Sequence, residues 1–159
     1  ERSRGLGDVY KRQDKKNAYL YCKFRDEQFA LYDQYAKRHG MLMKTLLVTN
    51  VLFYAEDGMT QADICQRTFQ SKQTVNLIIK NLLSDGYVTV NEMPGNKRNK
   101  IVRMTQAGRA YCQKVVRHIT WAEDTAMSMF SPEEQKQLIE LSRIFTKNLA
   151  MLIAREKEE

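Results

Sequence analysis

The sequence predicts a mainly α-helical protein that carries one small β-hairpin. Apolar residues recur at helical spacing through most of the chain, as in amphipathic helices. Two short stretches, YVTVNE (87–92) and KIVRMT (100–105), instead alternate apolar and polar residues, which is the period of a strand. The residues PGNKRN between them begin with a Pro-Gly pair and are expected to form the loop of a hairpin.

The N-terminal part of the chain is expected to contain two helices. The first thirteen residues, ERSRGLGDVYKRQ, lack an amphipathic period. We interpret residues 1–13 as a non-native or disordered leader, such as translated adapter or vector sequence, and leave them out of the expected fold. Apolar spacing predicts a first helix from about Lys16 to Arg38, with Gly40 as its left-handed cap. A second, buried helix is expected from Lys44 to Tyr54.

Two shorter helices follow, and each begins with a residue suited to an N-cap. Thr60 starts TQADICQRT, with Asp63 three positions later as in a capping box. Ser71 starts SKQTVNLIIKNLLSDG, which Gly86 ends. The apolar stripe of this second helix consists of Val75, Ile78, Ile79, Leu82 and Leu83.

The hairpin and two long helices complete the chain. Alternation places Val88 and Val90 on one face of the hairpin, opposite Val102 and Met104. Thr105 is expected to cap a helix that runs to about Met129. The last helix opens at SPEE (131–134), and its apolar residues repeat at nearly 3.5-residue spacing: Leu138, Leu141, Phe145, Leu149 and Leu152. The order of elements is that of a helix-turn-helix followed by a β-hairpin wing.

The composition limits the class of protein and its partners. A chain of 159 residues with 43% apolar and 28% charged residues is globular and can bury one core. No apolar run is long enough to span a membrane, and no secretory signal is recognisable. Three scattered cysteines argue against a disulfide framework or a zinc site and indicate a reducing cytoplasm. The net charge of +7 favours a polyanionic partner.

The helix that starts at Ser71 carries the candidate contacts to the DNA major groove. Its outward face shows Lys72, Gln73, Thr74, Asn76, Lys80 and Asn81. Amides such as those of Gln73 and Asn76 can bind adenine in a bidentate way, whereas Lys72 and the helix N-terminus favour phosphate. Leu77 lies outside the apolar stripe and either contacts a thymine methyl group or packs on the wing. The alternative is that these polar residues only cover the solvated side of a core helix.

The hairpin tip carries the second group of candidate contacts. Residues 93–103 include four cations, Lys97, Arg98, Lys100 and Arg103, and no acid. A hairpin beside a groove-binding helix meets the phosphate backbone or the adjacent minor groove, where arginine is favoured. We therefore expect double-stranded DNA as the partner of this surface.

The segment from Asp57 to Tyr111 resembles the DNA-binding region of the MarR family (multiple-antibiotic-resistance regulator) of winged-helix transcription factors. The matching motifs are SKQTV followed by Ile78, Ile79 and Leu82, then DGYV (85–88), and finally MTQAG (104–108). With its flanking helices the resemblance spans roughly residues 17–155. It implies a DNA-binding regulator in which Arg98 enters the minor groove. Asn96 stands where the family customarily has an aspartate that helps to hold this arginine.

The resemblance also implies a homodimer that reads a two-fold operator. The first and last helices would pair the subunits, because Phe24, Leu31 and Phe145 add more apolar surface than a compact winged helix needs. The expected division is a dimerisation helix in residues 14–42, the winged helix-turn-helix in residues 43–105, and linker and dimerisation helices in residues 106–159. The alternative is that the terminal helices pack only on each other within one monomer.

Many members of the family release DNA when a small aromatic or phenolic ligand binds between the dimer helices and the winged helix. The candidate residues for such an effector site are Tyr32, Tyr35, His39, Met41, Met43 and Trp121. Plain core packing, with His39 as part of a helix cap, is the alternative for this cluster. The resemblance thus implies a repressor that a ligand relieves.

Two further possibilities concern cysteine and catalysis. One branch of the family senses peroxide through a cysteine on the first helix, where Cys22 lies about one turn from the customary position. Cys65 and Cys112 are expected to pack as small apolar residues. The two histidines have no ligand-spaced Glu or Cys and no catalytic motif occurs, so we expect neither an enzyme nor a metal or cofactor. A protein-interaction module that docks its basic wing on an acidic partner is the other class of function.

Overall fold

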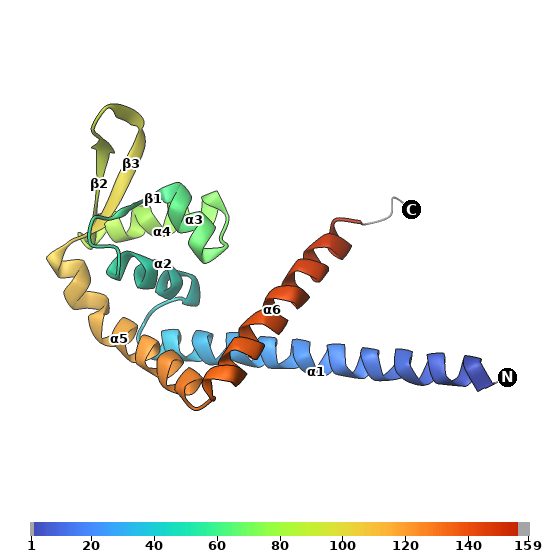
Figure 1. Ribbon diagram of the computed structural model, residues 1–159. Helices are drawn as coiled ribbons and strands as arrows, with labels where there is room; N and C mark the ends of the chain where they lie inside the picture. The colour runs from blue at the N-terminus through green and yellow to red at the C-terminus, as the bar shows by residue number, and fades with distance from the viewer. Residues whose placement is uncertain (1, 156–159) are drawn as a thin grey trace. The chain divides into compact units, whose positions relative to one another are not determined.

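The computed structural model describes residues 2–155, with side chains from Tyr10 onward. The chain is mainly helical with a small antiparallel sheet, as the sequence predicts (Figure 1). Its elements are α1 (Arg2–Arg38), α2 (Met43–Phe53), β1 (Met59–Thr60), α3 (Gln61–Thr68), α4 (Lys72–Ser84), β2 (Val88–Met93), β3 (Asn96–Met104), α5 (Gln106–Ser128) and α6 (Pro132–Ile153). The chain divides into two compact units, the first ending at Val116 and the second beginning at Arg117, within α5.

Helix α1 begins earlier than the sequence predicts. It includes residues 2–13, so the expected start at about Lys16 was wrong, and the leader is helical where it is described. Glu1 lies outside the described residues, and a non-native origin of the segment stays a prediction. An exposed helix needs no apolar stripe, and residues 10–15 are all exposed, so no sequence period marks the start of α1. The predicted end is confirmed, because Gly40 adopts a φ of 67° and Met41 N–H binds the Ala36 carbonyl.

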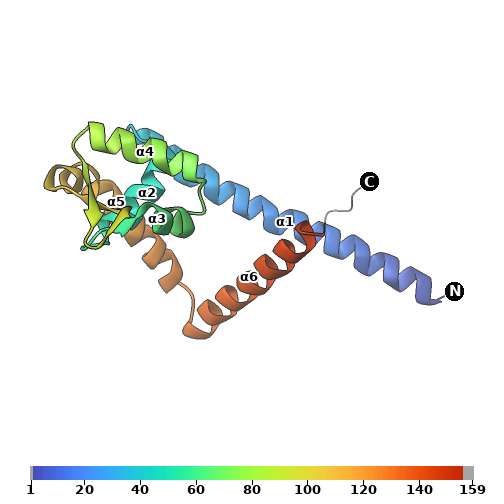
Figure 2. The ribbon, with the colours of Figure 1, turned by 90° about the horizontal axis from the view of Figure 1, so that it is seen from above.

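Two apolar cores hold the first unit together. The larger core lies among α2, α3, α4 and the sheet, and its fully buried members include Leu52, Ile64 and Val75. The smaller core joins the end of α1 and the first part of α5 to α2, through Ala36, Met41, Leu46, Phe53, Cys112, Val115 and Val116. Figure 2 shows α3 and α4 beside α2, in agreement with their contacts. The larger core therefore fixes the helix-turn-helix on the base of the wing.

The sheet has three antiparallel strands in the order β1-β3-β2. The predicted hairpin register is confirmed, since Val88 pairs with Met104 and Val90 with Val102. The expected loop of six residues was wrong: only Pro94 and Gly95 form the turn, and the polar residues from Asn96 onward already belong to β3. β1 was not predicted, because two residues carry no strand period and pair only with the distant β3.

The second unit contains the rest of α5 and the whole of α6. The predicted start of α6 at SPEE is confirmed, because Ser131 and Glu134 form a capping box, with Pro132 in the first turn. Helix α6 has no buried residue. Phe145 is half-buried, and the other large apolar side chains are exposed: Leu138, Ile139, Leu141, Ile144, Leu149, Met151, Leu152 and Ile153. Among the described residues, no helix combines the length and apolar character that crossing a membrane requires.

Candidate nucleic-acid interface

The helix-turn-helix is built by two side-chain caps and one left-handed residue. Thr60 Oγ1 accepts the Asp63 N–H at 3.1 Å and starts α3. Helix α3 ends at Phe69, which has a φ of 52° and a side chain that is 94% exposed. Ser71 Oγ then accepts the Thr74 N–H at 3.1 Å and starts α4. These caps set the two helix starts and confirm both predicted N-termini.

Helix α4 separates a buried face from an exposed face. Val75, Ile78, Ile79 and Leu82 are buried, as predicted, but Leu83 is 47% exposed and does not belong to the core. On the opposite side, the predicted contact residues Lys72, Gln73, Asn76 and Lys80 are all exposed. Exposure leaves these side chains available to a ligand, and it is equally what the solvated-face alternative requires.

Ser71 and Thr74 have a structural task at the start of α4. Ser71 Oγ donates to Thr74 Oγ1 at 2.9 Å while it accepts the Thr74 N–H. Their side chains thus hold the first turn, whose free N–H groups are suited to phosphate. Direct contact of Ser71 or Thr74 with DNA stays a prediction.

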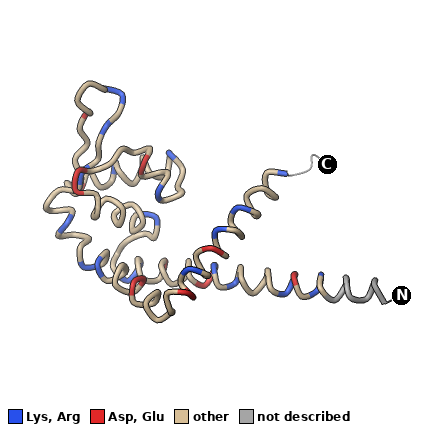
Figure 3. Tube along the Cα trace, in the orientation of Figure 1, with Lys and Arg blue, Asp and Glu red and all other residues tan. Residues whose placement is uncertain are grey.

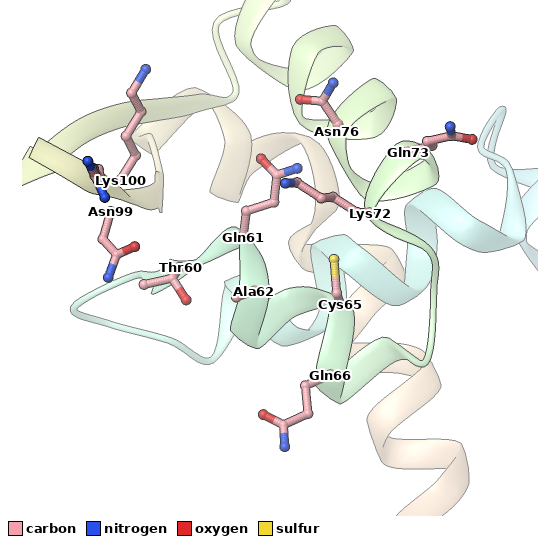
Figure 4. Close-up of a pocket in the computed structure, with 11 residues that line it drawn as sticks. Thr60, Gln61, Ala62, Cys65, Gln66, Lys72, Gln73, Asn76, Asn99 and Lys100 are labelled. Carbon is pink, nitrogen blue, oxygen red and sulfur yellow. The ribbon is translucent and has the colours of Figure 1, made fainter.

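An open groove of about 920 Å³ brings α3, α4 and the wing together (Figure 4). Of the predicted contact residues, it gathers Lys72, Gln73, Asn76, Arg98 and Lys100. The other members of the predicted set, Ser71, Thr74, Lys80, Asn96 and Lys97, do not line this groove.

The sequence prediction missed the contribution of α3 and of the middle of β3. Gln61 and Cys65 line the groove from α3, and Asn99 lines it from the wing. In Figure 4 the side chains of Gln61 and Lys72 extend toward one another, whereas Gln66 points away from them. The four-residue spacing of Gln61 and Cys65 places them on one helix face, which is the signal that could have identified this wall.

The wing presents its positive charge without internal neutralisation. Lys97, Arg98 and Lys100 are exposed, and none of the ion pairs within residues 10–155 involves them. Glu92 stands opposite Lys100 in the strand register, yet the two form no ion pair. Figure 3 shows cationic positions along the wing. A surface of this kind attracts an anionic ligand, because its cations have no competing partner in the described chain.

Asn96 organises the backbone at the wing tip. Its Oδ1 atom accepts the backbone N–H of Arg98 at 3.2 Å. An aspartate could make the same bond, so the amide at this position keeps the acceptor and omits the negative charge. Asn96 therefore acts on the backbone that carries Arg98.

The candidate effector residues fall into both units. Tyr35 and Met43 pack against the smaller core, and the Tyr35 hydroxyl donates to the Val115 carbonyl at 3.1 Å. Burial raises the pKa of Tyr35, and its ring lies 4.7 Å from that of His39, which is exposed. Tyr32 is half-buried and Met41 is buried, whereas Trp121 belongs to the second unit, where it is exposed and lies 5.3 Å from His118. Core packing thus accounts for Tyr35, Met41 and Met43, and an effector site stays a prediction.

The three cysteines have different surroundings. Cys112 is fully buried, as predicted, and burial raises the pKa of its thiol to about 11. Cys65 packs on the larger core, as predicted, but also lines the groove. Cys22 is half-buried on α1 and its redox role stays a prediction. Burial and the raised pKa therefore make the Cys112 thiol a poor nucleophile at neutral pH.

Comparisons with known proteins show which family this region is similar to. Residues 51–99 match the family model of the MarR family. A search of curated proteins found no match.

Three solved structures illustrate the similarity of the whole fold. NMB1585, a MarR family regulator from Neisseria meningitidis, is 18% identical, with a TM-score of 0.74 over 87% of this chain and 96% of that one. MepR of Staphylococcus aureus in complex with DNA is 21% identical, with a TM-score of 0.66 over 82% and 96%. BpsR of Bordetella bronchiseptica, whose DNA binding is regulated by 6-hydroxynicotinic acid, is 18% identical, with a TM-score of 0.64 over 81% and 91%. Residues 51–99 thus match the MarR family model, and the chain has the fold of MarR-family regulators.

Proposed function

We propose that this protein is a sequence-specific, double-stranded DNA-binding transcriptional regulator of the MarR family. The observation that carries the proposal is the groove lined both by exposed amides of α4 and by wing cations that form no ion pair within residues 10–155. The family match over residues 51–99 and the structure of the similar MepR bound to DNA support the same function.

The exposed face of α4 is suited to the DNA major groove. A recognition helix reads bases with the side chains near its N-terminus, and here these include Gln73 and Asn76. Each amide offers a donor and an acceptor that match adenine N7 and N6. Lys72 and the N–H groups of the first turn would bind the adjacent phosphates and fix the register of the helix.

The wing is suited to the neighbouring backbone and minor groove. The planar guanidinium of Arg98 fits a narrow minor groove, whose negative potential attracts it. Lys97 and Lys100 would hold the flanking phosphates as point charges. The wing would therefore supply affinity and orientation, while α4 would supply most of the base contacts.

The protein would bind DNA as a homodimer through its terminal helices. The apolar side chains of α6 are exposed in the single chain, and Phe24 and Leu31 of α1 are each 59% exposed. Large exposed apolar side chains gathered on one helix, as on α6, are typical of an interaction surface. Two linked winged helices gain effective concentration over one and match an operator with two-fold symmetry.

We further propose that the dimer is a repressor that a small aromatic or phenolic ligand releases from DNA. The control of DNA binding in the similar BpsR by 6-hydroxynicotinic acid supports this part of the proposal. The exposed His39, whose ring lies 4.7 Å from that of Tyr35, is one candidate contact for such a ligand in the first unit.

Selection of bound duplexes from a random pool tests the proposed function. We expect enrichment of an inverted repeat whose half-sites lie about 10 bp apart, or a multiple of that distance, because each half-site would receive one winged helix. Analytical ultracentrifugation of the bound complex should give two chains per duplex. A pool that shows no enriched sequence after repeated rounds contradicts the proposal.

A further inference from the structure

Leu77 is an apolar side chain in the middle of the exposed face of α4. It is 60% exposed, and it belongs to neither apolar core. Packing on the wing would bury it, so this exposure favours the other interpretation, contact with a ligand. A single exposed leucine is common on protein surfaces, so its exposure alone does not indicate a ligand. The neighbouring side chains indicate what Leu77 contacts.

The neighbours of Leu77 are amides. Gln73 lies four residues before it and Asn81 four residues after it, so the three side chains form one row along the helix. Asn76 is adjacent to this row, and all three amide residues are exposed. The row is therefore an apolar group flanked on both sides by groups that donate and accept hydrogen bonds.

This combination matches one kind of base pair. The row of Gln73, Leu77 and Asn81, with Asn76 beside it, holds no arginine or lysine, the residues that read guanine, and no carboxylate, which would read cytosine. In an A·T pair the major groove presents the N6 and N7 of adenine to an amide and the C5-methyl group of thymine to an apolar side chain. No other pair of ordinary DNA presents a methyl group there.

We propose that Leu77 is a specificity-determining residue that contacts the C5-methyl group of a thymine in the operator, beside an adenine read by Gln73 or Asn76. The inference rests on the proposed DNA-binding function and names the base class that this site reads. The half-site would then contain an A·T step under the middle of α4, and its recognition would depend on the methyl group.

Deoxyuridine substitution tests the contact, because deoxyuridine pairs as thymine does but lacks the methyl group. In the selected duplex, each thymine is replaced in turn, at symmetric positions in both half-sites, and the dissociation constant is measured by fluorescence anisotropy. At one position we expect binding to weaken about fourfold for each methyl group lost, the value for one buried methylene-sized group.

Two variants separate the contact from general effects. Leu77→Ala should bind the thymine and deoxyuridine duplexes equally well, because it cannot reach the methyl group. Leu83→Ala removes another exposed leucine of the same helix and should keep the wild-type discrimination. Thermal unfolding followed by circular dichroism should show all three proteins folded, since both leucines lie outside the buried core.

The outcomes separate the inference from the proposed function. Binding that is indifferent to every deoxyuridine substitution, or discrimination that survives in Leu77→Ala, overturns the inference and leaves the proposed function intact. If no duplex is bound at all, both are overturned.

Discussion

The side-chain oxygen of Asn96 accepts the backbone N–H of Arg98 at 3.2 Å, directly after the Pro94-Gly95 turn of the wing. This bond spans two residues and orders the backbone at the point where the Arg98 side chain leaves it. Arg98 itself is exposed. The bond therefore preorganises the wing tip for a ligand and contributes no charge of its own.

Replacing Asn96 should loosen the wing tip. In Asn96→Ala the acceptor is lost, and we expect faster hydrogen exchange at the Arg98 amide and DNA binding that is weaker by about 0.5–1.5 kcal/mol. Asn96→Asp keeps the acceptor and should keep the slow exchange, as measured by nuclear magnetic resonance. Equal exchange rates in wild type and Asn96→Ala would show that the bond does not order the tip.

Replacing Arg98 should weaken DNA binding directly. In Arg98→Ala, we expect a loss of about 1–3 kcal/mol and a shallower dependence of affinity on salt, because a phosphate or minor-groove contact is removed. Arg25→Ala is the matched control, since Arg25 lies on α1, away from the wing in sequence, and pairs with Asp26 at the surface. An anisotropy titration of both variants on the selected duplex measures the difference. Equal affinities would remove Arg98 from the interface.

The left-handed conformation of Phe69 should reduce the stability of the helix-turn-helix. A side chain other than glycine is strained at a φ of 52°, and the exposed ring makes little packing that would compensate. We expect Phe69→Gly to raise the free energy of unfolding by about 1 kcal/mol in a denaturant titration. Phe69→Ala keeps the Cβ atom and hence the strain, so it should bring no such gain. A less stable glycine variant would contradict this interpretation.

Stability should fall at high pH because of Cys112. The pKa of this buried thiol is about 11 in the folded protein, against an ordinary value near 9. Between these values the unfolded thiol loses its proton and the folded one keeps it. The contribution of the Cys112 thiol to the free energy of unfolding is therefore fully present below pH 9 and is lost as the pH rises toward 11.

We expect the Cys112 thiol to account for roughly 1–2 kcal/mol of the decrease in the free energy of unfolding at high pH. Denaturant unfolding from pH 8 to 10.5 measures it, with Cys112→Ala for comparison. Burial also raises the pKa of Tyr111, but this tyrosine is present in both proteins, so the difference between their pH profiles reports Cys112. Parallel profiles would contradict the predicted role of the thiol.

Much of the fold could be predicted because its signals are local. Thr60, Ser71 and Ser131 each lie next to the helix that they cap, and the structure contains all three caps. The strand register follows from the alternation of apolar and polar residues, which places Val90 and Val102 on the face of the sheet that packs on the larger core. These elements can therefore be predicted without knowing which distant residues they contact.

The errors in the predicted fold concern features that depend on distant contacts or on exposure. β1 exists because Met59 and Thr60 pair with β3, far along the chain, and the polar start of β3 has no apolar alternation to mark it. Helix α1 extends through an exposed segment without an apolar period.

The candidate site was predicted only in part. The exposed face of α4 and the wing cations follow from helical and strand periods. Gln61 and Cys65 were missed because their place in the groove depends on how α3 packs beside α4. The same limit applies to Leu83, which continues the apolar stripe in sequence but is 47% exposed and is not a member of the larger core.

The salt dependence of DNA binding tests the central claim most directly. The alternative function, docking of the basic wing on an acidic protein, uses the same cations but requires no affinity for DNA. We would measure fluorescence anisotropy on the selected duplex and on mixed genomic duplex over a range of salt concentrations, for wild type and for a variant with Lys97, Arg98 and Lys100 replaced by alanine. The proposed function predicts that the affinity of the wild type falls steeply as the salt concentration rises. For the variant, the slope of log affinity against log salt concentration should be shallower by about three for each subunit. Flat anisotropy on both duplexes at low salt, or identical slopes for the two proteins, would contradict it.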